Sequence, residues 1–305
     1  MDSLYPLSLT RSNDTIHTGG FSQQEEEVFG FKKNELFILP TALHELITLH
    51  RKNFARNLEF YKKKCLEENK EYNHETPGVF IHQDAKIHDT TVFDTTKGII
   101  VIEKGATINP FAYLVGPLRI DEQAIINPHA FISNSYIGQH SKIGGEVASS
   151  VIESYTNKGH YGYVGDSYVG SWVNLGGGTA TSNLKNTYGE ITMNGIKTGE
   201  QFLGAVIADH VKTAGNTSIY TGKIIGIGAH IYGTVTEDVP SFTNYISKNN
   251  LVAIPLEVTL SVADRMYARR NKAVMDEDKK MLSYAYTETE KDRKAKGVQE
   301  GKLSL

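Results

Sequence analysis

Residues 102–132 read IEKGATINPFAYLVGPLRIDEQAIINPHAFI, and an aliphatic residue stands at every sixth position of this stretch. After a five-residue step the spacing resumes at Ile137 and Ile143, and Ile81 and Ile87 precede the stretch at the same interval. Many of these residues are followed four positions later by a small one, as at Ala106, Ala112, Ala124 and Ala130. A later series with the same period runs through Ile207, Thr213, Ile219, Ile225 and Ile231.

A sustained period of six fits neither an α-helix, which needs apolar residues about 3.6 positions apart, nor a half-buried strand, which needs a period of two. In a parallel β-helix each hexapeptide supplies one short strand and one turn, the aliphatic side chain points into the interior, and the small residue fits the corner. A β-sandwich with chance spacing is the alternative, and the number of in-phase positions argues against it. The sequence therefore predicts an all-β solenoid, although periodicity alone does not give its handedness.

The segments on either side of the repeat differ from it. We expect residues 1–78 to form a polar segment plus a helix, residues 79–245 the β-helix, and residues 246–305 a helical extension. Residues 37–40, FILP, resemble a short strand, and Thr41 is placed to cap the helix that follows. The apolar face of that helix is predicted to consist of Leu43, Leu46, Ile47, Phe54, Leu58 and Tyr61.

Composition excludes several classes of function. Lys and Arg number 32 against 35 Asp and Glu, so the chain lacks the basic excess of a dedicated nucleic-acid binder. No apolar run approaches the roughly 18 residues that a membrane helix needs. Cys65 is the single cysteine, and the N-terminus has no secretory pattern. We expect a cytoplasmic protein that binds neither nucleic acid nor membrane.

The repeat is interrupted at residues 144–163 and 182–203, and loops of that length are usually functional or disordered. His160 stands in the first interruption, within TNKGHYGYVGD at 156–166. Between the two lies VNLGGGTAT at 173–181, whose glycines let a ligand approach the backbone and leave N–H groups free for a developing oxyanion. These glycines could also merely fit a cramped turn.

The segment KGHYGYVGDSYVGSWVNLGGGTATSN, residues 158–183, resembles the acetyltransferase half of the bifunctional N-acetylglucosamine-1-phosphate uridyltransferase/glucosamine-1-phosphate acetyltransferase family and its sugar nucleotidyltransferase-like relatives. The resemblance runs from about Ile81 to Tyr245. It implies a left-handed parallel β-helix that assembles as a homotrimer with its sites at subunit boundaries. It also implies acetyl-CoA as co-substrate and no metal.

The same resemblance implies a role for each matched residue. His160 matches the catalytic base that takes a proton from the attacking sugar amine, and an imidazole with an ordinary pKa of about 6.5 suits that task. The predicted substrate-binding residues are Glu146, Tyr163, Asn174 and Asn183. The predicted acetyl-CoA contacts are Gly177 beside the acetyl group and Gly215 and Gly233 along a groove between coils.

The chain also departs from the family. The nucleotidyltransferase half has no counterpart here, so we expect no uridylyl transfer. Ala148 replaces the lysine that grips the sugar phosphate, and Leu184 replaces the tyrosine after the matched asparagine. Because phosphate binding usually calls on Arg or Lys, the acceptor is expected to differ.

The sequence leaves two readings of the function open. One is an acetyltransferase acting on the amine of an amino sugar, a sugar phosphate or a nucleotide sugar. The other is a non-catalytic protein that binds such a sugar. A zinc hydratase on the same scaffold is disfavoured because the histidines include no H-x4-H pair. The basic residues Arg265, Arg269 and Arg270 could reach the phosphates of CoA, or could simply form a solvated helix face.

Overall fold

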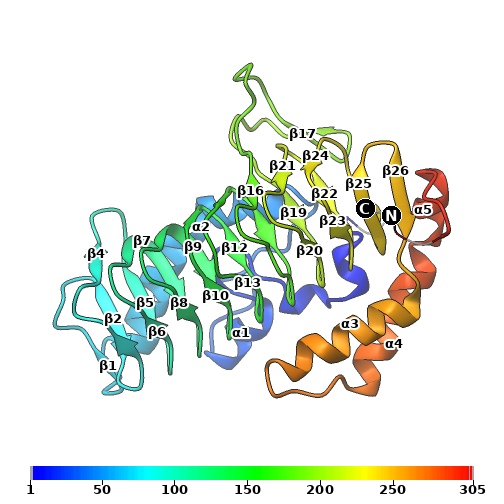
Figure 1. The fold of residues 1–305 in the computed structure, drawn as a ribbon. Coiled ribbons are helices and arrows are strands. Elements are labelled where there is room, and N and C mark those ends of the chain that lie inside the picture. The colour runs from blue at the N-terminus through cyan, green and yellow to red at the C-terminus, as the bar shows by residue number, and fades with distance from the viewer. Residues whose placement is uncertain (1–2, 302, 304–305) are drawn as a thin grey trace.

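The computed structural model describes residues 3–301 and residue 303. It shows a chain coiled into a prism of short parallel strands, with helices in the segments that precede and follow the prism in the sequence (Figure 1). Three faces make up the prism. Face 1 contains β2 (Val79–His82), β5 (Ile100–Ile102), β7 (Tyr113–Ile120), β9 (Phe131–Ile137), β12 (Val151–Ile152), β15 (Tyr168–Val169), β19 (Val206–Ile207) and β22 (Ile224–Ile225).

Face 2 contains β3 (Lys86–Ile87), β6 (Thr107–Ile108), β8 (Ile125–Ile126), β10 (Lys142–Ile143), β13 (Asn157–Lys158), β20 (Lys212–Thr213), β23 (His230–Ile231) and β25 (Thr243–Ser247), with Asn174 bridging β13 to β20. Face 3 contains β4 (Val92–Asp94), the first residues of β7 and β9, β11 (Glu146–Ala148), β14 (Tyr163–Gly165), β16 (Ala180–Thr181), β21 (Ser218–Ile219) and β24 (Thr234–Val235). The predicted fold class, a left-handed parallel β-helix of hexapeptide repeats with helical extensions, is confirmed.

The residues of the six-residue repeat fill the interior of the prism. The buried ones form one hydrophobic cluster that runs from the first coil to the last and includes Ile102, Ile108, Leu114, Ile120, Ile126, Ile132, Ile207, Ile219, Ile225 and Ile231. Corners follow a rule as well. The third residue after the interior one takes a positive φ at most of the first two corners of each coil, as at His129 and Tyr155. At the corner that carries His160 the position shifts by one residue in two successive coils, to Gly145 and Gly162. At the third corner the left-handed residue comes one position earlier, as at Asn134 and Asp166, which explains the five-residue steps.

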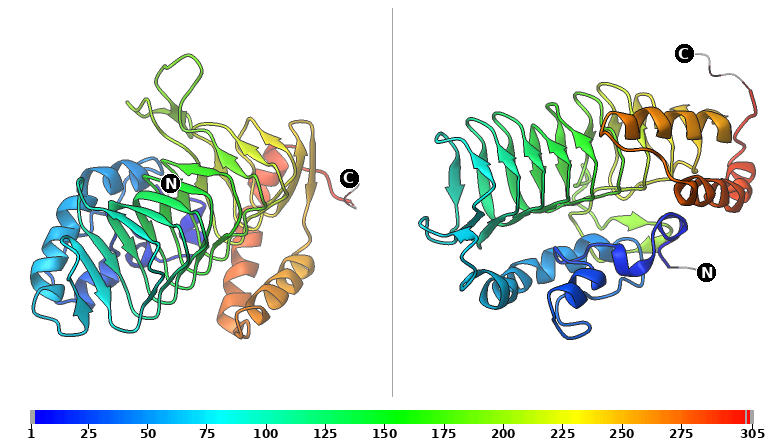
Figure 2. Two further views of the ribbon diagram at one scale, coloured as in Figure 1. Left: turned by 60° about the vertical axis from the view of Figure 1, so that its left-hand side comes forward. Right: turned by 90° about the horizontal axis from the view of Figure 1, so that it is seen from below.

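The N-terminal segment lies along face 1 and covers its outer side (Figure 2). Its elements are the short turns η1 (Leu7–Leu9) and η2 (Asn13–Thr15), α1 (Gln23–Val28), α2 (Glu45–Tyr61), the turn η3 (Lys62–Leu66) and β1 (Tyr72–Asn73), which pairs antiparallel with β2. A second hydrophobic cluster joins Phe54 and Leu58 of α2 to Val101 and Tyr168 on the outside of face 1. Residues 37–40 form no strand, so that expectation was wrong.

The start of α2 also differs from the prediction. The N-cap is His44, and Thr41 lies before the helix, where its backbone N–H donates to the carboxylate of Glu45 at 2.6 Å and its hydroxyl at 2.9 Å. The threonine therefore pairs with the first helical side chain instead of with the free backbone N–H groups. The expected apolar face is otherwise correct, since its members are buried.

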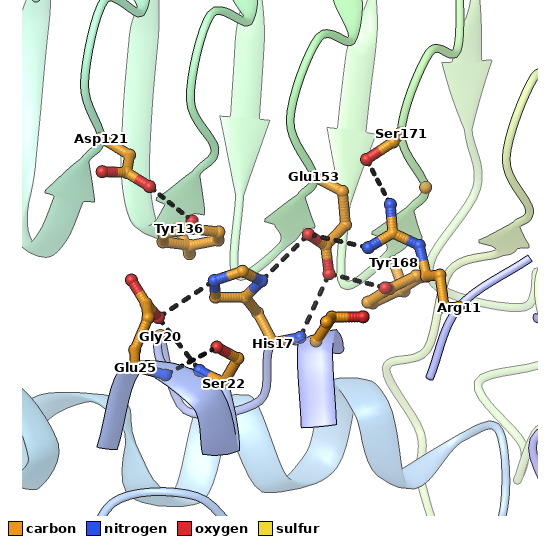
Figure 3. A network of polar contacts seen from close by, with 12 residues as sticks. Arg11, His17, Gly20, Ser22, Glu25, Asp121, Tyr136, Glu153, Tyr168 and Ser171 are labelled. Carbon is orange, nitrogen blue, oxygen red and sulfur yellow. Dashed lines mark hydrogen bonds and ion pairs between the residues drawn. The ribbon is translucent and has the colours of Figure 1, made fainter. Parts of the chain in front are cut away.

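A buried polar network pins the N-terminal segment to face 1 (Figure 3). The ring of His17 lies between Glu25 and Glu153, with Nε2 and Nδ1 each 3.0 Å from a carboxylate oxygen. Glu153 also pairs with Arg11 at 3.3 Å and accepts a hydrogen bond from the Tyr168 hydroxyl at 2.6 Å. Burial of the ring lowers the pKa of His17, but the attraction of the two carboxylates is stronger and raises that pKa to about 10. The segment is therefore held by charge as well as by apolar contact.

The C-terminal elements close the later end of the prism. β25 continues into an antiparallel hairpin with β26 (Asn250–Ala253), and α3 (Leu256–Ala268), α4 (Asp276–Glu288) and α5 (Glu290–Ala295) follow. Aromatic stacking joins α3 to the corner between faces 1 and 2. The ring centroid of Tyr267 lies 3.8 Å from that of Trp172, and the Trp172 centroid lies 4.3 Å from that of Tyr155. None of the described helices combines the length and apolarity needed to cross a membrane.

Candidate functional site

His160 lies on the corner between faces 2 and 3, two residues beyond the end of β13. Its side chain is exposed and makes no hydrogen bond to any described residue, whereas its neighbours on the strand are tied into the coil. The imidazole is therefore free to meet a ligand at this corner.

Lys158 fixes the backbone beneath that corner. It occupies an interior position that Ile143 fills one coil earlier, and its side chain is only 2% exposed. The ammonium donates to the carbonyl oxygens of Gly144, His160 and Gly162 at 2.6, 3.2 and 2.9 Å. Burial lowers its pKa to about 8, against the opposing effect of Glu146. From the sequence alone this lysine was given no role, although a charged residue at an interior position of the repeat indicates that its charge must be satisfied inside the coil.

Beyond His160 the same corner becomes a row of glycines. Gly177, Gly215 and Gly233 hold the position of His160 in the following coils, each two residues after an interior residue of face 2. A Cβ at Gly177 would meet His160 at 3.5 Å, and a Cβ at Gly233 would meet nothing within 4 Å. The backbone N–H groups of all three donate no hydrogen bond within the described chain. The corner therefore offers an open track lined by free backbone donors, starting at His160.

Tyr161 forms the side wall of this track. Its ring is 70% exposed and its hydroxyl donates to the Asn216 side chain at 3.1 Å, across two coils. A Cβ at Gly178 would approach that hydroxyl to 3.1 Å and Asn216 to 2.3 Å, and the backbone of Gly178 already has a φ of 76°. The glycine triplet is thus required by the crowding at Gly178 and open to solvent at Gly177. The expectation of a cramped turn is thus confirmed at Gly178, while a role of Gly177 toward a ligand stays a prediction.

Three predicted substrate-binding residues meet on face 3, beside the His160 corner. Tyr163 pairs in register with Glu146, and its hydroxyl accepts a hydrogen bond from Asn183 at 3.0 Å. Asn183 also donates to Asp166 at 2.7 Å, and Asp166 forms an ion pair with Arg51 of α2 at 2.8 Å. Burial, followed by Asp166 and Glu146, raises the pKa of Tyr163 to about 12, so it remains a neutral phenol. Asp166 and Arg51 were missed, and Arg51 lies too far away in the sequence to have been found.

The orientation of Tyr163 depends on Gly165, two residues later on the same face. A Cβ at Gly165 would lie 2.0 Å from the Tyr163 hydroxyl, so the ring lies directly over the glycine. Ala148, in the position of the expected phosphate-binding lysine, pairs in register with Gly165 and adds no charge. Face 3 therefore presents an aromatic ring and amide and carboxylate groups, without a cation from β11.

Asn174 lies apart from this group. It points outward from face 2, where its side-chain oxygen accepts a hydrogen bond from Asn157 at 2.8 Å. Its role in holding the sugar stays a prediction. The structure thus brings His160 and Gly177 together, gathers Glu146, Tyr163 and Asn183 next to them, extends the track to Gly215 and Gly233, and leaves Asn174 around the corner.

Comparison with known proteins gives a partial match. No family model matches this chain. The curated bifunctional sugar-1-phosphate nucleotidylyltransferase/acetyltransferase of Sulfurisphaera tokodaii is 36% identical over 152 residues, which cover 47% of this chain and 38% of that protein. The chain therefore matches less than half the length of this relative.

Solved structures are similar at lower identity. A Bacillus cereus acetyltransferase structure is 16% identical, covers 71% of this chain and 99% of its own, and has a TM-score of 0.31. LpxA from Acinetobacter baumannii is 15% identical, and the match covers 60% of this chain and 77% of LpxA with a TM-score of 0.35. Scores this low assign no activity. The chain is a hexapeptide-repeat β-helix protein, and the resemblance of its sequence to a bifunctional sugar-1-phosphate nucleotidylyltransferase/acetyltransferase is confirmed over about half of its length.

Proposed function

We propose that this protein is an acyltransferase that moves an acetyl group from acetyl-CoA to the amine of an amino sugar, a sugar phosphate or a nucleotide sugar, with His160 as general base. The observation that carries the proposal is the exposed imidazole of His160, which has no hydrogen-bond partner among the described residues, at the start of the open row Gly177, Gly215 and Gly233. The sequence match to a protein named as an acetyltransferase supports it.

The reaction uses groups that lie at the corner. The amine nitrogen attacks the thioester carbonyl while the His160 imidazole accepts the amine proton. The N–H of Gly177, which has no partner within the described chain, is available to the oxyanion that forms. Collapse of the tetrahedral intermediate expels the CoA thiolate, and the imidazolium returns the proton to it. The N–H groups of Gly215 and Gly233, which donate to no described residue, suit the amide-bearing arm of acetyl-CoA along the track.

The acceptor would rest on face 3. The amide of Asn183 and the phenol of Tyr163 are hydrogen-bonding groups suited to sugar hydroxyls, and the Glu146 carboxylate favours an approaching ammonium. These assignments, like Asn174, remain proposals. So does assembly as a homotrimer, in which a neighbouring copy would complete the site from the open side of the corner.

Thiol release from acetyl-CoA tests the function with glucosamine, glucosamine 1-phosphate and a nucleotide-linked amino sugar as acceptors. We expect His160→Ala to lower turnover about 100-fold or more, because general-base catalysis is worth about 10²–10⁴. His129→Asn is the matched control, since His129 is also exposed at this corner but two coils earlier. Equal turnover by wild type and His160→Ala would overturn the proposed base. Sugar binding without any turnover in the wild type would favour the non-catalytic alternative.

A further inference from the structure

A small cavity of about 90 Å³ lies between the end of α3 and face 2, around the corner from Tyr163. Its lining includes Lys142, Asn157 and Asn174 on face 2 and Arg269 and Arg270 after α3. One water needs only ~10–15 Å³ measured in the same way, so the cavity holds a group several times larger. Of the lining residues, only Asn174 has a role in the function proposed above.

The cavity is strongly basic. Within the part of the chain that the structure describes, no carboxylate lies within 4.0 Å of the charged groups of Lys142, Arg269 or Arg270. Lys272 adds another cation, whose Nζ lies 5.0 Å from the centroid of the Tyr155 ring. Burial and then the positive charges of Lys272 and Arg270 lower the pKa of the neighbouring His140. The surroundings therefore favour an anion.

Neutral donors complete the lining. Asn157 donates to the oxygen of Asn174, which leaves the Asn174 amide nitrogen without an acceptor among the described residues. A planar guanidinium and a side-chain amide together suit the several oxygens of a phosphate. Cations at the end of a helix also favour its dipole, which would explain Arg269 and Arg270 without any ligand. That explanation does not extend to Lys142, which stands on the opposite wall.

The two walls are held in place by stacking. Trp172 lies between Tyr155 of the corner and Tyr267 of α3, with ring planes within 7° and 12° of parallel. Tyr155 itself lines the cavity. This stack of three aromatic rings thus holds the cations that follow α3 against face 2.

We propose that this cavity binds the phosphate group of a phosphorylated amino-sugar acceptor. The proposal rests on the acyl transfer proposed above and deepens it. Asn157, which lines the cavity, and His160 are three residues apart, so their Cα atoms are at most about 11 Å apart. This short separation is the reason for assigning the anion to the acceptor whose amine would meet His160. Acetyl-CoA lying along Gly177, Gly215 and Gly233 would carry its own phosphates toward later coils. The cavity thus supplies the cations that Ala148 lacks.

Binding is tested on the full chain by calorimetric titration with inorganic phosphate and with glucosamine 1-phosphate. We expect Arg270→Gln and Lys142→Gln to weaken both about tenfold or more, the effect of losing one charge-assisted hydrogen bond. Arg265→Gln is the matched control, since Arg265 stands in the last turn of α3, just before Arg269 and Arg270, but does not line the cavity. Phosphate binding that is absent in the wild type, or equal in all four proteins, overturns the site.

Kinetics identify the source of the phosphate. With glucosamine 1-phosphate, Arg270→Gln should raise the KM for the acceptor about tenfold while the KM for acetyl-CoA and the kcat with unphosphorylated glucosamine stay unchanged. A raised KM for acetyl-CoA instead would overturn the assignment to the acceptor. If the wild type transfers no acetyl group but the two variants still lose phosphate binding, the proposed function fails and the anion site stands.

Discussion

Lys158 shows how much one interior residue decides about the candidate site. A lysine costs free energy when it is buried, and its lowered pKa reports that cost. It is tolerated because three backbone carbonyls receive its ammonium, among them the carbonyl of His160. The residue that disturbs the hydrophobic repeat is therefore the one that fixes the corner on which the proposed base stands.

Lys158→Met tests this positioning role. The methionine has a similar length but leaves the carbonyls of Gly144 and His160 without a donor among the described residues, while that of Gly162 keeps the Glu146 N–H. We therefore expect the free energy of unfolding to fall by about 1–3 kcal/mol. We also expect kcat for acetyl transfer to fall about tenfold with little change in KM, because the corner loosens while the binding groups remain. Urea unfolding and thiol release measure the two effects.

Ile143→Leu is the control for Lys158→Met, because it changes the same interior position one coil earlier while conserving volume. A Lys158→Met protein as stable and as active as Ile143→Leu would show that the ammonium contacts do not hold the corner.

At the scale of elements, the ring of Tyr267 links α3 to the β-helix, beside the buried residues Thr259 and Ala263 of the same helix. Tyr267 is buried and stacks on Trp172, while the cations that follow it reach the cavity on face 2. α2 makes a comparable link on another side, where Arg51 pairs with Asp166 behind Asn183. Both helices thus support side chains near the corner that the β-helix alone would leave unsupported.

Tyr267→Ala should weaken the attachment of α3 to the prism. Trp172 is the single tryptophan and is 8% exposed, so its fluorescence reports directly on this contact. We expect its emission to shift to the red and the free energy of unfolding to fall by about 3 kcal/mol, as for other large buried aromatic residues. Tyr284→Ala on α4, where the ring is exposed, should change neither. Unchanged emission from Tyr267→Ala would contradict the proposed attachment.

At the scale of the whole molecule, the N-terminal segment and the β-helix are joined through the His17 network. A histidine whose pKa is raised from 6.5 to about 10 in the folded state contributes stability that is complete below pH 6.5 and is lost as the pH rises to 10. Lys158 and Lys212 act in the opposite direction, since their pKa values are lowered to about 8 and about 7. The contribution of His17 to the pH dependence of stability is therefore isolated only by comparing variants.

The stability difference between wild type and His17→Gln should therefore depend on pH. We expect it to be largest near pH 6.5 and to shrink toward pH 10 by an amount on the order of 5 kcal/mol, at about 1.4 kcal/mol for each unit of pKa. Urea unfolding at several pH values measures it, with His88→Gln as the exposed control. A difference that is constant from pH 6.5 to 10 would show that His17 is not charged in the folded protein.

Much of the fold follows from local spacing. A six-residue period dictates which side chain points inward at each step, so the coil, its interior and the row of glycines after His160 were all predictable from the sequence. The same holds for the neighbourhood of Glu146 and Tyr163, because residues one coil apart come into register by counting.

The tertiary structure alone decided the contacts between distant segments. Arg51 meets Asp166, His17 meets Glu153, and Arg270 comes to line the same cavity as Lys142, each across more than a hundred residues. No periodicity encodes these pairs, because they depend on how the flanking helices pack against the outer faces of the prism. The sequence by itself therefore determined the coil and its corner, and packing determined which charges surround them.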